Sequence, residues 1–238
     1  MIVLSIDSSS KVATAALLDE NNLIAEYTIN NKLEHSTLIM DIIDKLLKDS
    51  NLDIDDIDGF VVSKGPGSFT GLRIGMATVK GLSFGSNKPY ISISSLDALA
   101  YSLINFNGII CPIMDALRSS VYTCLYKGNN GELEAITEYS ALELDELIDL
   151  LKEKNEPVLF AGDAVNKHKE YLLQHLPMAN FAPNHLSLIR ASSLGELGIK
   201  KLLNNECDEL NSSPFYLKKP QAQRELEKRL ALKNENSL

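Results

Sequence analysis

A glycine loop is the first feature of this sequence whose residue types suit chemistry, because loops of this kind can bind phosphate groups. Gly65, Pro66, Gly67 and Ser68 follow a short apolar run and precede an apolar segment with helical spacing. Gly65 and Gly67 can take positive φ and bring backbone N–H groups to a helix N-terminus, where the macrodipole favours an anion. Ser68 is a suitable N-cap for that helix.

A tight strand-to-helix turn, in which the geometry demands glycine, is the alternative explanation of this loop. The loop lacks the Gly-Lys-Ser/Thr ending of a P-loop. The helix expected from Phe69 to Phe84 carries Gly71, Gly75 and Thr78 at i, i+4 and i+7, so small residues line one side of it. Such a stripe lets another helix approach closely, and that helix can belong to this chain or to a partner.

Metal-ligating and nucleophilic residues do not form recognisable sets. His168 and His175 are seven residues apart, His35 and His185 stand alone, and no pair has a spacing suited to a metal. The three cysteines are far apart and odd in number, which predicts buried thiols in a reducing compartment rather than disulfides. We expect no catalytic residue and no resident metal ion.

Composition limits the classes of partner. The 238-residue chain has 45% hydrophobic residues and a net charge of −9, so most of its surface should repel nucleic acid. The mixed-charge segment from Lys218 to Lys233 is the exception, and it suits either a solvated helix or an RNA contact. The sequence shows neither a membrane span nor a leader with a basic start, which predicts a cytoplasmic protein.

The two halves of the chain begin in the same way. Apolar runs at 2–6 and 109–114 end in Asp7 and Asp115, and each returns as a second strand, at 14–18 and 121–126, so the two aspartates should be equivalent in a duplicated unit. Further strands are expected at 23–29, 60–62, 89–93, 133–139 and 157–160, with a hairpin turn at 128–131. Helices are expected at 36–48, 69–84, 96–103, 142–151, 164–175 and 191–204.

The helices at 36–48 and 69–84 are together more apolar than packing on one sheet requires. The apolar residues of the first helix spread over more than the ~100° stripe that a sheet covers, so some of them should face outward. We therefore predict a surface for a partner or for a second copy of the chain, and the alternative is an ordinary core helix pair. The predicted surface consists of Leu38, Met40, Ile42, Leu46, Gly71, Gly75 and Thr78.

The run from Gly65 to Gly75, GPGSFTGLRIG, resembles the signature of the bacterial TsaB family, also called YeaZ. The resemblance continues at 4–9, 35–36, 94–96, 115–122 and 214–217, and so covers most of the chain. It implies an α/β fold of the actin-like ATPase (sugar kinase/heat-shock chaperone) superfamily. Each of the two lobes would be built on a mixed βββαβα sheet, the first from residues 1–104 and the second, abbreviated, from 105–211, with a tail at 212–238.

In function, the resemblance implies a non-catalytic partner of the transferase TsaD. With the TsaE ATPase, the pair would support transfer of a threonylcarbamoyl group from its adenylate to the adenosine next to the anticodon, in tRNAs that read codons beginning with A. Members of the family would form a homodimer when alone and contact tRNA only indirectly. TsaD-like enzymes hold a metal with two histidines at i, i+4, and residues 92–99 contain no histidine.

The superfamily also implies where a nucleotide would bind, because its turns after the strand-end aspartates surround phosphate groups. The corresponding residues here are Asp7, Ser8, Gly65, Gly67, Ser68 and Asp115. No tightly bound cofactor is expected, although ATP or ADP can act in the complex with partners. Leu117 and Ser120 replace an arginine and a glutamate that usually follow the Asp-Ala pair, which weakens any role for Arg118.

A small kinase or hydrolase that uses Asp7, Asp115 and the glycine loop on phosphates is the alternative function. A metallopeptidase is a third alternative, and it requires metal ligands that this sequence does not supply. The missing histidine pair and the short second lobe favour the binding partner over both enzymes.

Overall fold

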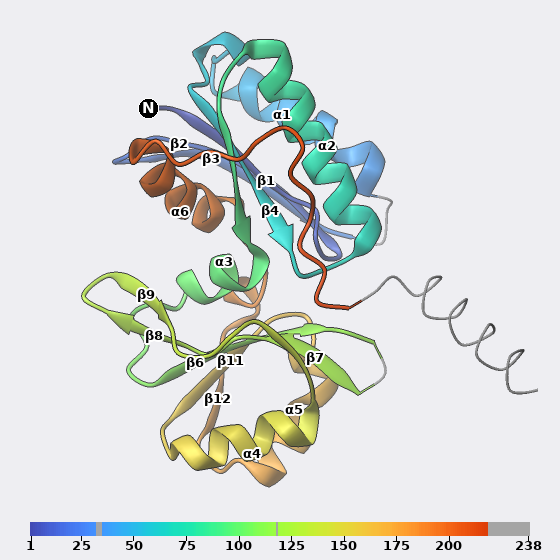
Figure 1. The fold of residues 1–238 in the computed structure, drawn as a ribbon, viewed down its shortest axis with the longest axis vertical. Helices are drawn as coiled ribbons and strands as arrows, with labels where there is room; N and C mark the ends of the chain where they lie inside the picture. Colours follow the sequence, from blue (N-terminus) through green and yellow to red (C-terminus); the bar gives the residue numbers. More distant parts are fainter. Residues whose placement is uncertain (32–34, 118, 219–238) are drawn as a thin grey trace, which may run out of the picture.

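The computed structural model describes residues 1–31, 35–117 and 119–218, without the side chains of residues 35–37. Two lobes are stacked along the long axis of the molecule, and each is built on one β-sheet (Figure 1). The predictions for Arg118 and for an RNA contact beyond Lys218 fall outside the described residues.

The first lobe has a five-stranded sheet with the order β3-β2-β1-β4-β5. β1 pairs antiparallel with β2 and parallel with β4, and these three strands are buried along almost their whole length. Strands covered on both faces need such continuous apolar runs. The elements of this lobe are β1 (Val3–Asp7), β2 (Val12–Leu18), β3 (Leu23–Asn30), α1 (His35–Asp49), η1 (Ile54–Asp56), β4 (Gly59–Gly65), α2 (Phe69–Ser86), β5 (Tyr90–Ser94) and α3 (Ser95–Tyr101).

The second lobe has the strand order β10-β7-β6-β11-β12, and β8 pairs with both β6 and β9. Its elements are β6 (Ile109–Asp115), β7 (Ser120–Thr123), β8 (Tyr126–Asn129), β9 (Glu132–Ala135), β10 (Ser140–Glu143), α4 (Leu144–Lys154), β11 (Val158–Ala161), α5 (Val165–His175), β12 (Ala179–Phe181) and η2 (Asn184–Leu186). The strand predicted at 121–126 is divided into β7 and β8, and the strand predicted at 133–139 ends at Ala135. The short strand β12 was not predicted.

The predicted duplication is confirmed by the pairing of the strands. Asp7 is the last residue of β1 and Asp115 is the last residue of β6. β6 pairs antiparallel with β7 and parallel with β11, as β1 does with β2 and β4. The two aspartates therefore occupy equivalent positions, one in each lobe.

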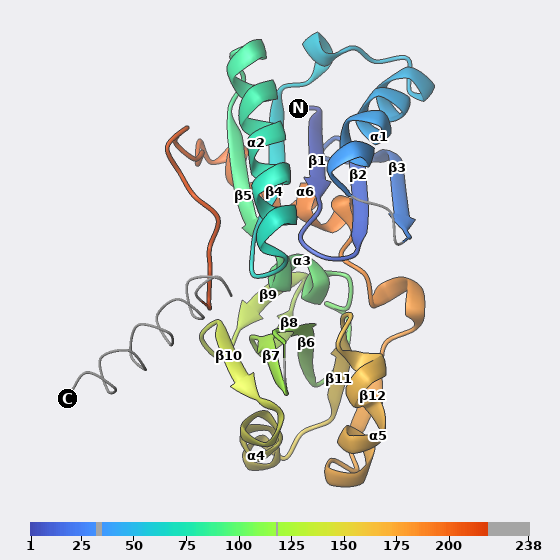
Figure 2. The same ribbon diagram turned by 90° about the vertical axis from the view of Figure 1, so that its right-hand side faces the viewer.

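Helix α6 (Ala191–Leu203) corrects the predicted domain boundary at residue 211. The helix packs on the sheet of the first lobe, where the Ser5 hydroxyl donates a hydrogen bond of 2.6 Å to the Ala191 carbonyl oxygen. Gly195 and Gly198 allow the close approach, because a Cβ at Gly198 would lie 2.4 Å from the Val61 side chain. The first lobe thus includes the segment from about residue 190, and Figure 2 shows α6 behind the sheet and α1 and α2 in front of it.

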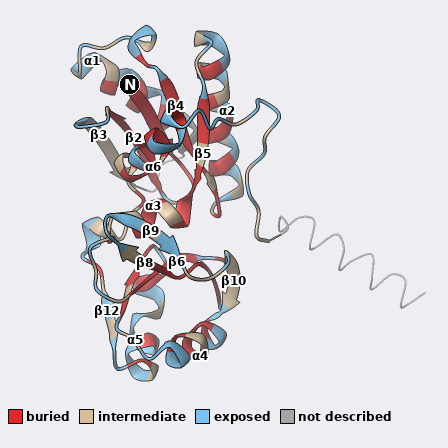
Figure 3. Ribbon diagram, turned by 60° about the vertical axis from the view of Figure 1, so that its left-hand side comes forward, coloured by how far each residue is buried: buried red, intermediate tan, exposed pale blue. Residues whose placement is uncertain are grey.

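Three hydrophobic clusters form the core, and one of them joins the lobes. The first lies between the sheet and helices α1 and α2, and the second lies inside the second lobe. The third contains residues of β1, β4, α3 and α6 together with Ile110, Met114 and Tyr126 of the second lobe. The buried strands and the central position of α3 are visible in Figure 3. The lobes are therefore held together by a continuous apolar contact.

Candidate functional site in the cleft between the lobes

Asp7 shapes the turn that follows β1. Its side chain is fully buried, and its Oδ1 accepts hydrogen bonds from the backbone N–H of Ser9, at 3.1 Å, and from the Ser63 hydroxyl. The neighbouring Ser8 hydroxyl is also buried and donates to the Gly71 carbonyl oxygen at 2.9 Å. Asp7 and Ser8 therefore lie behind the cleft surface, where they fix the shape of the turn.

The glycine loop is packed against this same turn. Ser68 is the N-cap of α2, as predicted, since its hydroxyl accepts a hydrogen bond from the Gly71 N–H at 3.3 Å. The Ser68 N–H donates to the Ser9 carbonyl oxygen, and a Cβ at Gly67 would lie only 2.3 Å from that oxygen. Positive φ occurs at Gly65 but not at Gly67, so the prediction for Gly67 is wrong: close approach of the backbone, not φ, requires glycine there.

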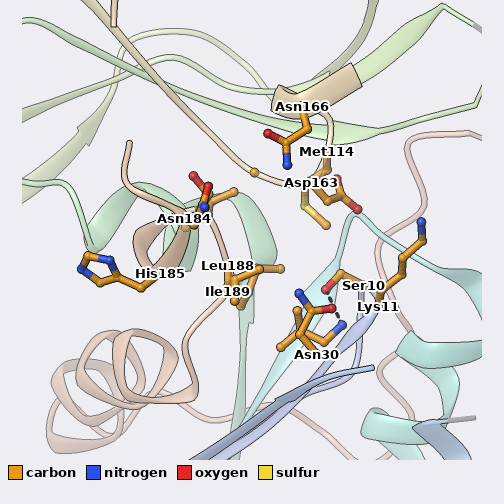
Figure 4. A pocket seen from close by; sticks show the side chains of 14 residues that line it. Ser10, Lys11, Asn30, Met114, Asp163, Asn166, Asn184, His185, Leu188 and Ile189 are labelled. Atoms are coloured by element: carbon orange, nitrogen blue, oxygen red, sulfur yellow. Dashed lines mark hydrogen bonds between the residues drawn. The ribbon is translucent and has the colours of Figure 1, made fainter. Parts of the chain in front are cut away.

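Two adjoining pockets form a cleft between the lobes and share Ser10, Lys11, Met114 and Asp163. The pocket beside the glycine loop, of about 540 Å³, is lined by Gly67, Ser68 and Asp115 among others. The second pocket, of about 580 Å³, has several polar lining residues, among them Lys11, Asn30, Asn166, Asn184 and His185 (Figure 4). Of the six predicted nucleotide residues, Gly67, Ser68 and Asp115 line the cleft, whereas Asp7, Ser8 and Gly65 are buried behind it.

Asp115 and Asp163 bring two carboxylates together on the second-lobe side of the cleft. The backbone N–H of Asp115 donates to the Asp163 carboxylate at 3.0 Å, and the Asp115 carboxylate forms an ion pair with Lys167 at 3.2 Å. Asp163 is exposed at the cleft surface, yet the protein atoms around it in both pockets take its carboxylate partly out of water. Burial, together with the negative charge of Asp115, raises the pKa of Asp163. Sequence reasoning missed Asp163, although its place just after β11 was a signal.

Metal-ligating residues do not gather in the part of the chain that the structure describes, where no group of three or more histidine, cysteine or acidic side chains is arranged around one point. On α5, burial lowers the pKa of His168, with a smaller effect from the charge of Lys167. Cys111 and Cys124 are buried as predicted, and burial raises the pKa of the Cys111 thiol to about 12. Cys207 is exposed, so the prediction that it is buried is wrong.

The predicted partner surface is partly corrected by the packing of α1. Ile42 and Leu46 face the sheet and are buried in the core of the first lobe, and Leu38 is half-buried against it. Met40 points outward, with 49% of its surface exposed. Most of the apolar residues of α1 therefore pack inside the first lobe, and of the predicted α1 residues Met40 is the exposed one that a partner could contact.

The small-residue stripe of α2 also faces inward. A Cβ at Gly71 would lie 1.8 Å from the Ser8 carbonyl oxygen, and one at Gly75 would lie 2.8 Å from the Ser8 hydroxyl oxygen. Gly71 and Gly75 therefore pack against the turn after β1, which contains Ser8 of this same chain. The prediction of an open groove at Gly71 and Gly75 is wrong. Thr78, the third member, is half-buried.

A different face of α2 is open. Arg73, Ala77, Gly81 and Phe84 follow one another at i, i+4, i+8 and i+11 and are all exposed, and Phe84 has 76% of its surface exposed. We call these four residues together with Met40 the outer face of α1 and α2. The two helices lie side by side on the same face of the sheet (Figure 1). Phe84 was missing from the predicted surface because its place outside the core cannot be read from spacing alone.

None of the helices within the described residues is both long and apolar enough to cross a lipid bilayer.

Comparison with known proteins places the chain in a family. A family model described as TsaD, tRNA N6-adenosine threonylcarbamoyltransferase, matches residues 22–226. The tRNA threonylcarbamoyladenosine biosynthesis protein TsaB of Bacillus subtilis (strain 168) is 38% identical over 226 residues, which cover 94% of this chain and 96% of the relative.

Solved structures show the same fold. YeaZ from Pseudomonas aeruginosa has a TM-score of 0.75 at 21% identity over 91% of this chain and 99% of its own. Component A of the (R)-2-hydroxyglutaryl-CoA dehydratase of Acidaminococcus fermentans has a TM-score of 0.51 at 11% identity over 85% and 99%. The predicted actin-like ATPase fold is confirmed. The chain belongs to the TsaB family of tRNA threonylcarbamoyladenosine biosynthesis proteins.

Proposed function

We propose that this protein is the non-catalytic partner of a TsaD-type transferase in the threonylcarbamoylation of tRNA. The pair, together with a TsaE-type ATPase, transfers the threonylcarbamoyl group to the adenosine next to the anticodon in tRNAs that read codons beginning with A. The site of this reaction is the cytoplasm, where tRNA is modified. The B. subtilis relative is named as a biosynthesis protein, and the name of the matching family model is that of the transferase.

The outer face of α1 and α2 is the observation that carries this proposal. Phe84 and Met40 are large apolar side chains that remain exposed on neighbouring helices, and Gly81, three residues before Phe84 on α2, leaves room for a close approach. An exposed apolar patch on a helix pair is typical of a protein interface. A helix pair of the partner would complete a four-helix arrangement on this face.

A second copy of this chain would occupy the same face when TsaD is absent. The two proteins share a fold family, so a two-fold homodimer through α1 and α2 would imitate the heterodimer and compete with it. We therefore propose that the homodimer is the resting form and that TsaD replaces one copy.

Nucleotide, in this proposal, acts in the complex and is not held tightly by this chain alone. The Ser9 carbonyl oxygen already accepts the Ser68 N–H that a phosphate would use, and Lys167 already pairs with the Asp115 carboxylate. The kinase or hydrolase alternative needs both groups to be available to a phosphate, so the geometry favours the binding partner.

Reconstitution tests the proposal. TsaD, TsaE, tRNA and threonylcarbamoyl-adenylate are combined with and without this protein, and modified adenosine is measured in the tRNA. We expect product with the complete set, little without this protein, and none from this protein alone. Modification that is equally fast without this protein would contradict the proposal, as would ATP hydrolysis or transfer by this protein alone.

A further inference from the structure

The segment 206–218, which follows α6, crosses from the first lobe to the second. We call it the strap. It runs along the outer side of β5, reaches the glycine loop, and ends at the cleft between the lobes (Figures 1 and 2). It contains the sequence Pro214-Phe215-Tyr216-Leu217, to which the proposed function assigns no role.

The first half of the strap is fixed to the first lobe by polar contacts. The Asp208 N–H donates to the Tyr90 carbonyl oxygen at 2.8 Å, and the Asp208 carboxylate accepts from the backbone N–H of Ser92 at 2.9 Å. The Tyr90 hydroxyl donates to the Glu209 carbonyl oxygen at 2.7 Å. This half of the strap therefore lies along β5 and is fixed to it by hydrogen bonds.

The glycine loop and the start of α2 hold the next part of the strap. The Phe215 N–H donates to the Lys64 carbonyl oxygen at 2.7 Å, and the Phe215 carbonyl oxygen lies 2.6 Å from where a Cβ of Gly65 would be. The Tyr216 ring lies 5.0 Å from the Phe69 ring, and the Arg73 Nε donates to the Tyr216 hydroxyl at 3.2 Å. Residues of the GPGSFTGLRIG signature thus bind the strap.

Phe215 and Lys218 carry the strap over to the second lobe. The Phe215 ring meets the Tyr139 ring edge-on at 5.9 Å, and the Lys218 ammonium donates to the Ala116 carbonyl oxygen at 3.3 Å. Tyr139 is itself held, because its hydroxyl donates to the Asp97 carboxylate at 2.8 Å. The second-lobe end of the strap therefore rests on an anchored aromatic ring and on the residue that follows Asp115.

We propose that the strap is a latch that fixes the two lobes relative to each other and closes the glycine-loop side of the cleft. Phe215, Tyr216 and Lys218 line that pocket together with Gly67 and Asp115, so a shift of the lobes relative to each other would break the contacts of Phe215 with Tyr139 and of Lys218 with Ala116. An aromatic pair and a hydrogen bond from a charged donor are each small enough to be broken reversibly. Release of the strap then loosens the glycine-loop side of the cleft, while the apolar cluster that joins the lobes stays intact.

Hydrogen exchange measured by mass spectrometry on the full-length chain tests the latch. The variant Phe215→Ala removes the ring contact with Tyr139 while keeping the backbone bond to Lys64. We expect exchange in 113–117, 119–123 and 136–140 of the second lobe to become roughly three- to tenfold faster, the range implied by the loss of an aromatic pair. Exchange in β2 and β3 should not change.

Tyr139→Ala removes the same contact from the opposite lobe and should make exchange in 213–217 of the strap faster by a similar factor. Leu210→Ala is the matched control, because Leu210 lies in the strap with 49% of its surface exposed, and it should leave all of these segments unchanged. Faster exchange confined to 64–73 in the first variant would show a local cover over the glycine loop and would overturn the latch. An unchanged rate of exchange in 213–217 of the Tyr139→Ala variant would also overturn the latch.

Discussion

The backbone N–H of Ser68 donates a hydrogen bond of 2.6 Å to the backbone carbonyl oxygen of Ser9. This bond places the turn after β1 at the mouth of the glycine loop, where a phosphate oxygen would otherwise be the acceptor. Gly67 and Gly71 flank the contact, and each has a backbone oxygen of the turn where its Cβ would be. The loop and the start of α2 therefore position this turn, and through it the first-lobe side of the cleft.

Alanine at Gly71 or Gly67 should destabilise the protein. A Cβ at either position meets a backbone oxygen that cannot move aside without disturbing the buried turn. We expect the free energy of unfolding to fall by roughly 1–3 kcal/mol for each variant, the usual cost of overpacking. Urea unfolding followed by circular dichroism measures it.

Gly81→Ala is the control on the same helix, because a Cβ there meets no described atom within 4 Å. Alanine is the better helix former, so this variant should be more stable by up to ~1 kcal/mol. A Gly71→Ala protein as stable as the unaltered chain would contradict the packing of the turn against α2.

Gly198→Ala tests the assignment of α6 to the first lobe. The added methyl group would overlap the Val61 side chain of β4, so we expect a loss of roughly 1–3 kcal/mol in the free energy of unfolding. Leu203→Ala near the end of the same helix, where half of the side chain is exposed, should change stability by about 0.5 kcal/mol or less. An equal loss in the free energy of unfolding for the two variants would argue that α6 does not pack on the first-lobe sheet.

Asp163→Asn should stabilise the protein near pH 7. The raised pKa of Asp163 means that the folded state holds a proton more strongly than the unfolded state does, so ionisation of this group costs stability. The cost is absent below the unfolded pKa of about 4 and develops as the pH rises through the folded pKa. Asparagine removes the charge and can still accept the hydrogen bond from the Asp115 N–H.

The pH dependence of unfolding provides the measurement for this variant. The difference in unfolding free energy between Asp163→Asn and the unaltered chain should be largest at pH 7 and should shrink toward pH 4. A difference that does not vary with pH would mean that the charge of Asp163 is not the cause.

The purified protein should contain no stoichiometric metal ion and should not hydrolyse ATP at an appreciable rate. The sequence lacks a histidine pair at residues 92–99, and Lys167 already pairs with the carboxylate of Asp115. Elemental analysis and a phosphate-release assay measure the two properties. One zinc or iron ion per chain, lost on replacement of His168 or His175, would contradict this prediction.

Local patterns were sufficient to predict much of the fold. The apolar runs ending in Asp7 and Asp115 predicted two equivalent strands, and Ser68 predicted the start of α2, because strand ends and helix caps depend on neighbouring residues. The domain boundary was wrong because the apolar side of α6 does not say which sheet it covers. Contacts between distant residues decide that, such as those of Gly195 with Leu18 and of Gly198 with Val61.

The candidate surfaces were harder to predict for a related reason. Spacing identified a small-residue side on α2, but the direction in which it faces depends on Ser8, more than 60 residues earlier in the chain. In the same way, Asp163 meets Asp115 across 48 residues through strands β11 and β6. Periodicity is local, whereas these contacts arise from the pairing of distant strands.

Binding of this protein to a TsaD homologue, the proposed partner, titrated with single-residue variants, tests the proposed function most directly. Phe84→Glu and Met40→Glu place a charge on the outer face of α1 and α2, and both should fold normally because their side chains are exposed. We expect each to weaken binding by roughly thirtyfold or more, the size of a hot-spot loss. Leu173→Glu, at a half-exposed residue of α5 in the second lobe, is the matched control and should bind as the unaltered protein does. Unchanged affinity for both Phe84→Glu and Met40→Glu would contradict the account, because the partner would then bind elsewhere.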